Sequence, residues 1–407
     1  MKLFPHQDRA LNDTYEQNKV AYYLDMGLGK TFVGSEKMWE LNTPFNLVIC
    51  QKSKIEDWKE HFETFYKDYQ VIVFDKQKLE SVPAESVIII NYDKVWRRDE
   101  LMGLKNFTLM LDESSTIKNE KSHRSKFILK LRAVNVILLS GTPTGGKYEE
   151  LWSQLHLLGW TITKKLFLKQ FMVMDWDELN QQNKIIGYKN VDRLKAKLRK
   201  HGAIFMKTEE VFDLPKMNDV IVKIQGTKEY LEFARHHIIE IGEDLLVGDT
   251  ATAKKLYLRQ LASAYNQNKL SYVKDLIDST NDRVIIFYNF KKEYAALVSL
   301  IDKPISTING DLKDLSAYND HEDSITLIQY QAGAMGLNLQ KANKIIYFSL
   351  TDKSELFEQS KKRIHRIGQD RPCFYYYLLA AGSIEWRMLD VLKERKDYTD
   401  ALFEEEL

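Results

Sequence analysis

The sequence predicts an α/β protein in which two lobes, each built on a parallel β-sheet, are separated by a helical insert. Short runs of Val, Ile and Leu without polar alternation recur in both halves of the chain, and longer amphipathic stretches separate them. Such runs are typical of strands covered on both faces, as in the parallel sheet of an α/β domain. Between the two halves, from residue 151 to about residue 230, the strand pattern fades, which indicates mostly helices and connectors.

The expected strands define the domain boundaries. In the first half they are residues 20–24, 47–50, 71–74, 87–90, 108–111 and 136–139. In the second half they are residues 284–288, 325–329, 344–349 and 374–379. We therefore expect a first lobe over residues 1–158, a helical insert and linker over residues 159–225, and a second lobe over residues 226–407.

Length and composition narrow the class of protein. The chain has 407 residues and is 44% hydrophobic, which is enough for two or three domains with a core in each. Cys50 and Cys373 lack metal-ligand spacing, so we expect a reduced, cytoplasmic compartment and no structural zinc. No apolar run is long enough to cross a bilayer. Because 59 Lys and Arg against 58 Asp and Glu leave a net charge of +1, local basic patches would have to hold any nucleic acid.

A glycine-rich segment, Asp-Met-Gly-Leu-Gly-Lys-Thr at residues 25–31, follows the first expected strand and opens a helical stretch. Phosphoryl oxygens need close backbone N–H donors, which glycines allow, together with a helix N-terminus and one ammonium group. Lys30 would hold the β- and γ-phosphates, and Thr31 would hold a magnesium ion. The usual pattern has a further glycine where Leu24 stands, but the strand-loop-helix context still indicates a phosphate loop.

Two adjacent carboxylates, Asp112 and Glu113, end the strand expected at residues 108–111. At a strand end, Asp112 can hold magnesium through its water shell, while Glu113 reaches the water that attacks the γ-phosphate. This pair, downstream of a phosphate loop, indicates hydrolysis of a nucleotide rather than phosphate transfer to a substrate.

Two arginines in the second lobe complete the catalytic hypothesis. We expect a helix that begins near Asp352 and ends at Gly368, on which Gln359, Arg363 and Arg366 fall at i, i+4 and i+7 on one polar face. Arginine fingers of this kind contribute about 10³- to 10⁵-fold in rate. In our hypothesis they reach the γ-phosphate only when the nucleotide closes the two lobes.

Taken together, the motifs resemble the SWI/SNF class of superfamily-two helicases, which are ATP-driven translocases on double-stranded DNA. The resemblance runs nearly end to end and in order. It is carried by Phe4-Pro5-His6-Gln7, residues 25–31, residues 47–58 with Ser53 and Trp58, Asn91-Tyr92, Asp112-Glu113 with Ile117-Lys118-Asn119, Ser140-Gly141-Thr142-Pro143, residues 284–287, residues 333–339 and Gln-Ser-Lys-Lys-Arg-Ile-His-Arg-Ile-Gly-Gln at residues 359–369. The resemblance implies two tandem RecA-like lobes with the helical insertion between them.

The same resemblance assigns roles to individual residues. Glu113, Arg363, Arg366, Asp112 and Lys30 would be catalytic. ATP would be bound by Gln7, which would read adenine, and by Met26, Gly27, Leu28, Gly29, Lys30, Thr31, Gly336, Arg363 and Arg366. Thr31 and Asp112 would hold Mg²⁺. DNA phosphates would be contacted at Ser53, Asn91, Tyr92, Lys118 and Gly333.

Several residues depart from the family pattern. Ser114 and Ser115 stand where Gly-His or Ala-His is usual. We therefore expect the polar contacts between the Asp112-Glu113 motif and residues 140–143 to differ from those of the family. Thr144 to Gly146 replace a Leu-Gln-Asn stretch. Tyr330-Gln331 replaces Thr followed by Arg or Lys, which argues against a phosphate contact there.

The leading function is a DNA-stimulated ATPase that moves along duplex DNA without fully separating the strands. A strand-separating DNA or RNA helicase is the first alternative, and its wedge would have to come from the insert. An ATP-binding scaffold is the second. The basic stretch at residues 189–200 fits a solvated amphipathic helix and a DNA-facing one equally well. We expect a minimal, monomeric motor in the cytoplasm of a bacterial or phage-infected cell, directed to its task by a recruiting protein and independent of membranes.

Overall fold

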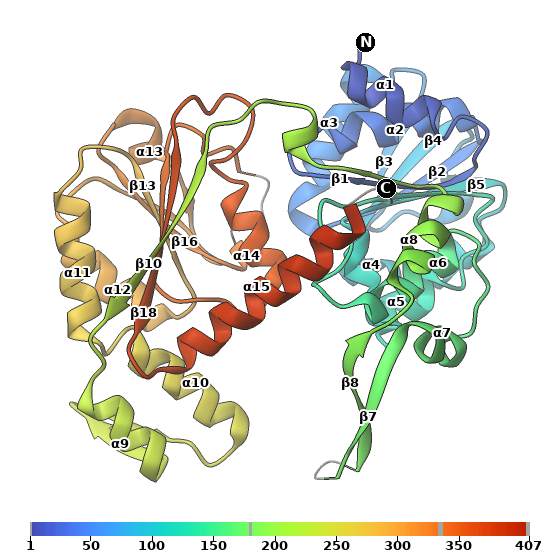
Figure 1. Ribbon diagram of the computed structural model, residues 1–407. Helices are drawn as coiled ribbons and strands as arrows, with labels where there is room; N and C mark the ends of the chain where they lie inside the picture. Colours follow the sequence, from blue (N-terminus) through green and yellow to red (C-terminus); the bar gives the residue numbers. More distant parts are fainter. Residues whose placement is uncertain (1, 179–180, 333–336, 404–407) are drawn as a thin grey trace. The chain divides into compact units, whose positions relative to one another are not determined.

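The computed structural model describes residues 2–178, 181–332 and 337–403, which form two compact units (Figure 1). Unit 1 runs up to Val211 and also includes the chain from Asp397 onward, and unit 2 is Phe212–Lys396. The chain thus divides between Val211 and Phe212, whereas the sequence suggested boundaries at residues 158 and 225. Among the described residues, no helix combines the length and apolar character that crossing a membrane requires.

Unit 1 is built on a seven-stranded sheet of order β3-β4-β2-β5-β6-β1-β9, whose neighbouring strands are parallel. Its strands are β1 (Lys19–Leu24), β2 (Phe45–Cys50), β3 (Gln70–Val73), β4 (Ser86–Asn91), β5 (Phe107–Asp112), β6 (Asn135–Leu139) and β9 (Ala203–Met206). The strands expected in the first half are all present. The short strand β9 adds to them, because it is recognisable only from its parallel pairing with β1.

Helices cover both faces of this sheet (Figure 1). They are α1 (Pro5–Asn12), α2 (Lys30–Leu41), α3 (Ile55–Phe65), α4 (Tyr92–Val95), α5 (His123–Ile128), α6 (Trp152–Leu157), α7 (Lys164–Phe171) and α8 (Val191–Lys200). The connections through α2 (β1 to β2) and α3 (β2 to β3) run towards the β3 edge of the sheet. Those through α4 (β4 to β5) and α5 (β5 to β6) run towards the β9 edge. Because crossovers between parallel strands are right-handed, α2 and α3 lie on the face opposite α4 and α5.

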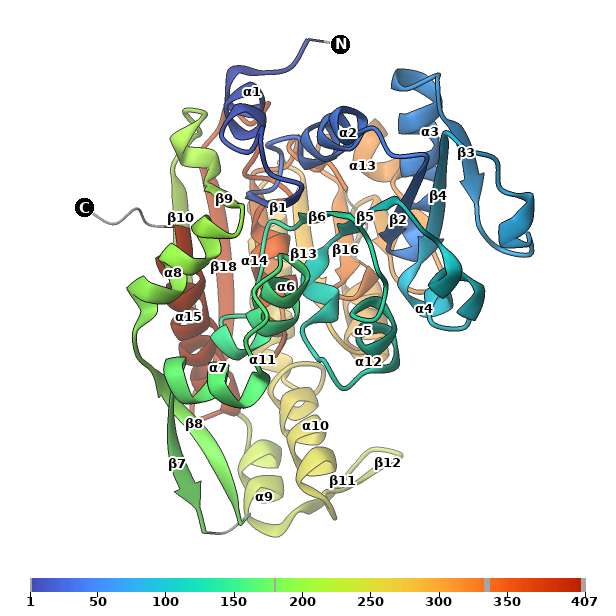
Figure 2. The same cartoon turned by 90° about the vertical axis from the view of Figure 1, so that its right-hand side faces the viewer.

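The insert departs from the expected helices and connectors. Between α7 and α8 the chain forms an antiparallel hairpin of β7 (Met172–Asp177) and β8 (Gln182–Tyr188), which projects from unit 1 (Figures 1 and 2). Apolar and acidic residues alternate from Met174 to Asp177 of β7, as in a strand with two different faces, but β8 is too polar to show such a pattern. The amphipathic helix expected at residues 189–200 is confirmed as α8, with Leu194 and Leu198 buried.

The core of unit 1 draws on both ends of its chain. Buried side chains from β1, β2, β4, β5 and β6 form one cluster with those of α5 to α8. Leu402 and Phe403, at the end of α15 (Ile384–Phe403), belong to the same cluster. The Tyr148 hydroxyl also donates a hydrogen bond of 2.8 Å to the carbonyl of Tyr398. The C-terminal segment is therefore part of the packing of unit 1.

Unit 2 is built on a second seven-stranded sheet, of order β10-β18-β17-β13-β16-β14-β15. Its strands are β10 (Met217–Ile224), β13 (Val284–Tyr288), β14 (Ile305–Ile308), β15 (Lys313–Asp314), β16 (Ile325–Gln329), β17 (Lys344–Tyr347) and β18 (Cys373–Ala380). Neighbouring strands are parallel, except that β15 runs antiparallel to β14. This confirms the predicted fold class of two parallel-sheet lobes.

The helices of unit 2 are α9 (Lys228–His236), α10 (Ala251–Ala262), α11 (Gln267–Asp278), α12 (Lys291–Leu300), α13 (Ser316–Asp320), α14 (Ser354–Lys361) and most of α15. They again cover both faces of its sheet, with α11 and α12 on one face and α14 and α15 on the other. A small hairpin of β11 (Ile238–Ile241) and β12 (Asp244–Val247) packs with α9 and α10 in a separate apolar cluster.

Candidate functional site

The glycine-rich loop at residues 25–31 connects β1 to α2 and needs glycine at two positions. Gly27 and Gly29 have φ values of 89° and 76°, which side chains other than glycine rarely adopt. A Cβ atom at Gly29 would also lie 2.1 Å from Nε2 of Gln7. The loop can therefore follow this path, with its backbone at the start of α2, only because these positions lack a side chain.

Gln7 is packed against this loop from α1. Its Oε1 accepts a hydrogen bond of 3.0 Å from the Phe4 backbone N–H, and its Nε2 donates one of 3.2 Å to the Leu28 carbonyl. His6 Nε2 lies 3.0 Å from the same carbonyl. The structure thus places the residue expected to read adenine directly beside the expected phosphate loop.

Lys30 begins α2 and turns its ammonium group back over the end of β1. Its Nζ donates to the carbonyls of Leu24 at 2.9 Å and Asp25 at 3.3 Å. A Cβ atom built at Gly141 would lie 3.2 Å from this Nζ, so the segment after β6 closely approaches the lysine. The strand order β6-β1 explains why two segments so far apart in sequence meet here.

Asp112 lies at the carboxyl end of β5 and is held by two aromatic residues. Trp58 Nε1 donates a hydrogen bond of 2.9 Å to Asp112 Oδ2, and the Tyr92 hydroxyl donates one of 2.8 Å to the Asp112 carbonyl. Burial raises the pKa of Asp112, while the indole N–H and the positive charge of Lys30 oppose that shift. A partly buried carboxylate of this kind gains from a nearby cation.

Glu113 follows in a left-handed conformation, with φ of 53° and ψ of 59°. This conformation is uncommon for a residue with a side chain and marks a sharp turn at the strand end. The Ser140 hydroxyl, at the end of β6, lies 3.5 Å from Glu113 Oε2. The expected catalytic carboxylates and the segment at residues 140–143 are therefore brought together at neighbouring strand ends.

These residues suit a magnesium–nucleotide complex. In the part of the chain that the structure describes, no group of three or more His, Cys, Asp or Glu is arranged to hold a metal ion. Magnesium, however, commonly takes only one or two protein ligands, and waters and phosphate oxygens complete its octahedron. Thr31 and the Asp112 carboxylate are a donor set of that kind, and burial makes the carboxylate receptive to a cation.

The residues expected to contact DNA have different environments. Ser53 is exposed, in the short 3₁₀ helix Lys52–Lys54. Lys118 is half-buried, with its Nζ 3.9 Å from Glu150 Oε1. Gly333 lies outside the described residues.

Asn91 and Tyr92, by contrast, are both buried, with exposures of 4% and 2%. Asn91 Oδ1 caps α4 by accepting from the backbone N–H groups of Asp93 and Lys94. Since Tyr92 is bonded to Asp112, any DNA contact at this turn has to come from backbone groups.

The predicted helix around the two arginines is wrong in its extent. Helix α14 spans only Ser354–Lys361, so Arg363 and Arg366 lie in the turns that follow it and not on one helical face. The turn forms because Gly368 has a φ of 91° and because Gln369 Nε2 donates to the carbonyls of Gln340, Ala342 and Ile364. These contacts hold the chain against the segment before β17.

Both arginines contact the described part of the segment at residues 337–339. Arg363 is 2% exposed, with its Nη1 3.5 Å from the Leu337 carbonyl. Arg366 Nη1 donates to Asn338 Oδ1, and burial lowers the pKa of this guanidinium. Gly336, the other residue expected at the nucleotide in this motif, lies outside the described residues.

Sequence reasoning missed two residues that support the site. Trp58 belongs to the segment at residues 47–58 that carries the family resemblance, without an expected role of its own; it is buried and bonded to Asp112. Thr208 donates from its hydroxyl to Asp25 Oδ2 at 3.0 Å and so holds the start of the loop. A buried indole N–H needs an acceptor, which was a usable signal for Trp58. No comparable signal in the sequence indicated Thr208.

Comparison with known proteins agrees with this geometry. A family model described as SNF2-related domain matches residues 18–269, and a model described as helicase conserved C-terminal domain matches residues 268–368. The matches therefore cover the sheet of unit 1, the sheet of unit 2 apart from β18, and the motifs described above apart from the segment that contains Gln7 and the final Gln369.

Named relatives match over nearly the whole chain. One is the Xenopus laevis SWI/SNF-related matrix-associated actin-dependent regulator of chromatin subfamily A-like protein 1, which is 24% identical over 91% of this chain and 41% of its own length. Another is the Arabidopsis thaliana ATP-dependent DNA helicase DDM1, which is 25% identical over 89% of this chain and 56% of its own length. The chain thus spans only about half of these proteins.

Among solved structures, the Sulfolobus solfataricus SWI2/SNF2 ATPase core in complex with dsDNA aligns over 98% of this chain and 92% of its own. The sequence identity is 21% and the TM-score is 0.47.

Proposed function

Because the chain belongs to the family of proteins with an SNF2-related domain, we propose that it is a DNA-dependent ATPase that moves along double-stranded DNA. Several relatives are named as ATP-dependent helicases or chromatin-remodelling ATPases. These names support an ATP-driven DNA motor. We further propose that this motor moves along duplex DNA without separating its strands.

One observation carries the assignment of ATP hydrolysis. The neighbouring strands β5, β6 and β1 deliver Asp112 with Glu113, Ser140 and the glycine-rich loop to the same edge of one sheet. Ligands of open α/β sheets bind at the carboxyl ends of the strands. A phosphate loop and two adjacent carboxylates at this edge are the groups that hydrolysis of a nucleotide requires.

Each residue then has a chemical role. The N–H groups around Gly27 and Gly29, with Lys30, hold the phosphates, and Gln7 contacts the base. Thr31 and Asp112 would hold magnesium, which when bound would neutralise charge on the phosphate oxygens. Glu113 orients the attacking water and accepts its proton. Arg363 and Arg366 of unit 2 stabilise the charge that develops on the γ-phosphate.

DNA would be held through its backbone. Ser53 and Lys118, with backbone groups near Asn91 and Tyr92 and at Gly333, would contact phosphates, which position a protein on DNA without reading its sequence. The net charge of +1 is consistent with a local grip rather than a general attraction to polyanions.

The first test is the rate of ATP hydrolysis with duplex DNA, single-stranded DNA and RNA measured side by side. We expect the strongest stimulation by duplex. Glu113→Gln should lower kcat by at least about 10²-fold while ATP still binds, because only the proton acceptor is lost. Glu80→Gln, an exposed carboxylate in the 3₁₀ helix Leu79–Ser81, is the matched control. Stimulation by RNA alone, or near-normal turnover by Glu113→Gln, would overturn the proposal.

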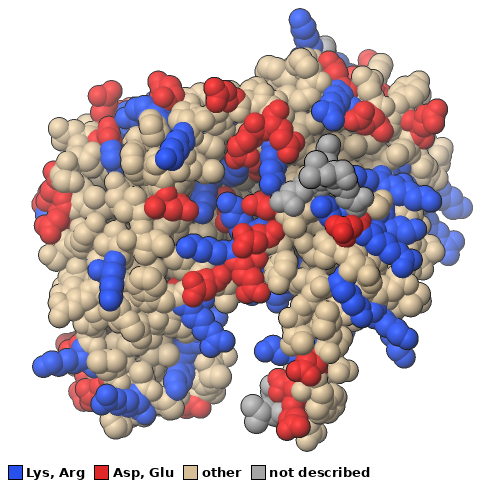
Figure 3. All heavy atoms as spheres, in the orientation of Figure 1, with Lys and Arg blue, Asp and Glu red and all other residues tan. Residues whose placement is uncertain are grey.

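The hairpin of β7 and β8 favours one alternative, a strand-separating helicase. Trp176 on β7 is 56% exposed, and an exposed aromatic side chain can stack on an opened base pair. Acidic side chains gather on the hairpin, however, and would repel the phosphate backbone (Figure 3). Fork unwinding that disappears in Trp176→Ala, with duplex-stimulated hydrolysis intact, would favour this alternative over translocation on closed duplex.

A further inference from the structure

We propose that Gln154 is a positioning residue for ATP hydrolysis, which fixes the loop of Glu113 to the loop of residues 140–143 and to the strand before the phosphate loop. The inference rests on the proposed function and deepens it. Neither the motifs nor the expected site residues include Gln154, which lies in the first turn of the short helix α6.

The amide of Gln154 makes hydrogen bonds to three other segments of unit 1. Its Oε1 accepts from the Tyr23 hydroxyl at 2.9 Å and from the Ser114 hydroxyl at 2.8 Å. Its Nε2 donates to the Pro143 carbonyl at 2.7 Å. The side chain is fully buried. Both lone pairs of the oxygen are therefore used, and no solvent competes for these contacts.

Each partner lies in a segment that leads into, or belongs to, the proposed site. Tyr23 belongs to β1, just before the loop that begins at Asp25. Ser114 follows Glu113, and Pro143 ends the segment that begins with Ser140. Since β5, β6 and β1 are neighbours in the sheet, one amide joins the three strand ends that carry the proposed chemistry.

The orientation of the amide is determined by its partners. The Pro143 carbonyl can only accept, so the NH₂ group has to face it. Burial keeps Tyr23 protonated by raising its pKa well above the usual range, so its hydroxyl donates to the amide oxygen. Replacing the amide by a group without a donor would leave the buried Pro143 carbonyl unpaired, which is costly inside a protein.

This arrangement also accounts for a departure in the sequence. Ser114 and Ser115 stand where the family usually has a small residue followed by histidine. Here Ser114 is the residue that carries the polar connection, through Gln154, to Pro143. Ser140 provides a second, longer contact to Glu113 itself.

The test compares Gln154→Leu, Ser114→Ala and the double variant with the wild type, by kcat and KM for ATP with saturating duplex DNA. Gln154→Leu should lower kcat on the order of 10-fold or more, because small misplacements of catalytic groups are costly in rate. KM should change less than about twofold, since the glycine loop and Lys30 are untouched. Ser114→Ala should have a smaller effect. The double variant should match Gln154→Leu, because the two residues act through one contact.

The variant Gln154→Glu separates positioning from folding. Once protonated, the introduced acid offers a carbonyl acceptor and one O–H donor, as the amide does, but its ionised form offers no donor to Pro143. The ratio of its kcat to that of the wild type should therefore increase as the pH is lowered from about 8.5 to about 6. The corresponding ratio for Gln154→Leu should not change over this range. Gln182→Leu, at an exposed glutamine on β8, is the control.

The outcomes distinguish this inference from the proposed function. A wild type without duplex-stimulated hydrolysis overturns both. Suppose that the wild type hydrolyses ATP and that Glu113→Gln abolishes this activity. A near-normal kcat in Gln154→Leu would then overturn the role of Gln154 alone. A Gln154→Leu variant that raises KM without lowering kcat, or effects that add independently in the double variant, would also overturn it.

Discussion

At the scale of single residues, Trp58 shows how a residue outside the phosphate loop supports its chemistry. Its indole N–H is bonded to Asp112, the carboxylate proposed to hold magnesium. The hydrogen bond stabilises the ionised carboxylate and so opposes the upward shift in its pKa that burial causes. Groups that orient a metal-ligating carboxylate often affect metal affinity as much as activity.

We therefore expect Trp58→Phe to keep the packing but to weaken magnesium binding by about 10-fold. The pKa of Asp112 should rise further, so the acidic limb of the ATPase profile should move to higher pH. ATPase rates measured against Mg²⁺ concentration and pH will test this. Trp39→Phe, at an exposed tryptophan of α2, is the control. Equal Mg²⁺ dependence in Trp58→Phe and wild type would show that the indole N–H has no such role.

His61 on α3 links the stability of unit 1 to pH. The distance from His61 Nε2 to the Ser35 hydroxyl oxygen is 2.9 Å. Because the Ser35 hydroxyl donates its proton to the Thr31 carbonyl, His61 Nε2 is protonated and donates to Ser35. Burial lowers the pKa of His61 to about 4. The neutral ring is therefore the form that the fold of α2 and α3 accommodates.

Below about pH 6.5, His61 becomes protonated in the unfolded chain but stays neutral in the folded protein, so the free energy of unfolding should fall as pH drops towards about 4. Above about pH 6.5, His61 is neutral in both states and this loss of stability is absent. We expect a loss of about 2 kcal/mol, allowing for partial screening by solvent. Denaturant unfolding at several pH values will measure it. His61→Gln, which keeps an N–H donor but does not titrate, should flatten the dependence, whereas His321→Gln, at an exposed position, should not.

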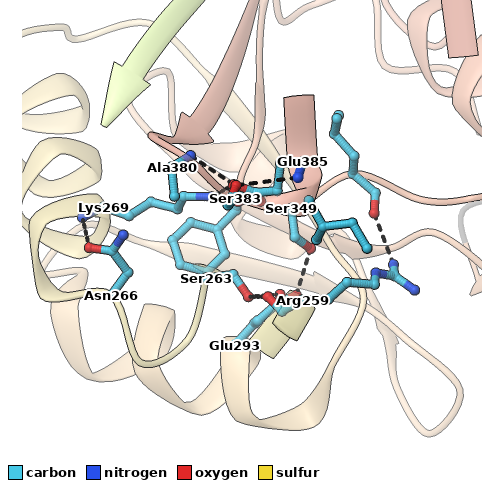
Figure 4. A network of polar contacts seen from close by, with 12 residues as sticks. Arg259, Ser263, Asn266, Lys269, Glu293, Ser349, Ala380, Ser383 and Glu385 are labelled. Atoms are coloured by element: carbon cyan, nitrogen blue, oxygen red, sulfur yellow. Dashed lines mark hydrogen bonds and ion pairs between the residues drawn. The ribbon is translucent and has the colours of Figure 1, made fainter. Parts of the chain in front are cut away.

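At the scale of elements, the helices of unit 2 are tied to the sheet by a buried polar network (Figure 4). Lys269 of α11 is paired with Glu385 of α15 at 2.8 Å, with side-chain exposures of 0% and 2%. Lys269 also donates to the Phe348 carbonyl, and Glu385 accepts from the Ala380 N–H. The pair thus joins two helices to the ends of β17 and β18.

Removing one partner of a buried pair leaves an uncompensated charge. Lys269→Met should therefore lower the free energy of unfolding by about 3–5 kcal/mol, and adding Glu385→Gln should recover part of that loss. Denaturant unfolding of the single and double variants will measure both effects. In the control, Lys291→Met breaks a fully exposed pair with Asp311 and should change stability little. A double variant less stable than Lys269→Met would contradict this account.

The segment after α14 shows a limit of element prediction from sequence. The polar spacing of Gln359, Arg363 and Arg366 is helical, yet the helix ends at Lys361. The competing contacts come from Gln369, which bonds the carbonyls of Gln340 and Ala342. A local period cannot reveal such contacts, since they depend on where the preceding segment lies.

At the scale of the whole molecule, the near-zero net charge shapes how DNA would be bound. On the face of the molecule that Figure 3 shows, both Lys and Arg and Asp and Glu are present on each unit. Affinity would then come from a limited set of phosphate contacts rather than from long-range attraction.

If about five phosphates are neutralised, raising the salt from about 50 mM to about 200 mM should weaken duplex binding on the order of 10²- to 10³-fold. Fluorescence anisotropy with unrelated duplexes of equal length will measure the slope and should give similar affinities for each sequence. Binding that survives high salt, or that differs widely among sequences, would contradict backbone recognition. Lys118→Ala should reduce the slope of log affinity against log salt concentration by about 1, which corresponds to the loss of one phosphate contact.

By itself, the sequence determined the fold class and most central strands, and it suggested the chemistry that we propose for the glycine-rich loop and the Asp112-Glu113 pair. Hydrophobic periodicity and the needs of a phosphate group are local properties, which a short segment displays on its own. Only the tertiary structure decided which side chains serve those groups: Trp58 on Asp112, Gln154 between three strand ends, and the turn that carries Arg363 and Arg366. The physical reason is that these contacts join residues far apart in the chain, and they exist only because the order of the strands brings them together.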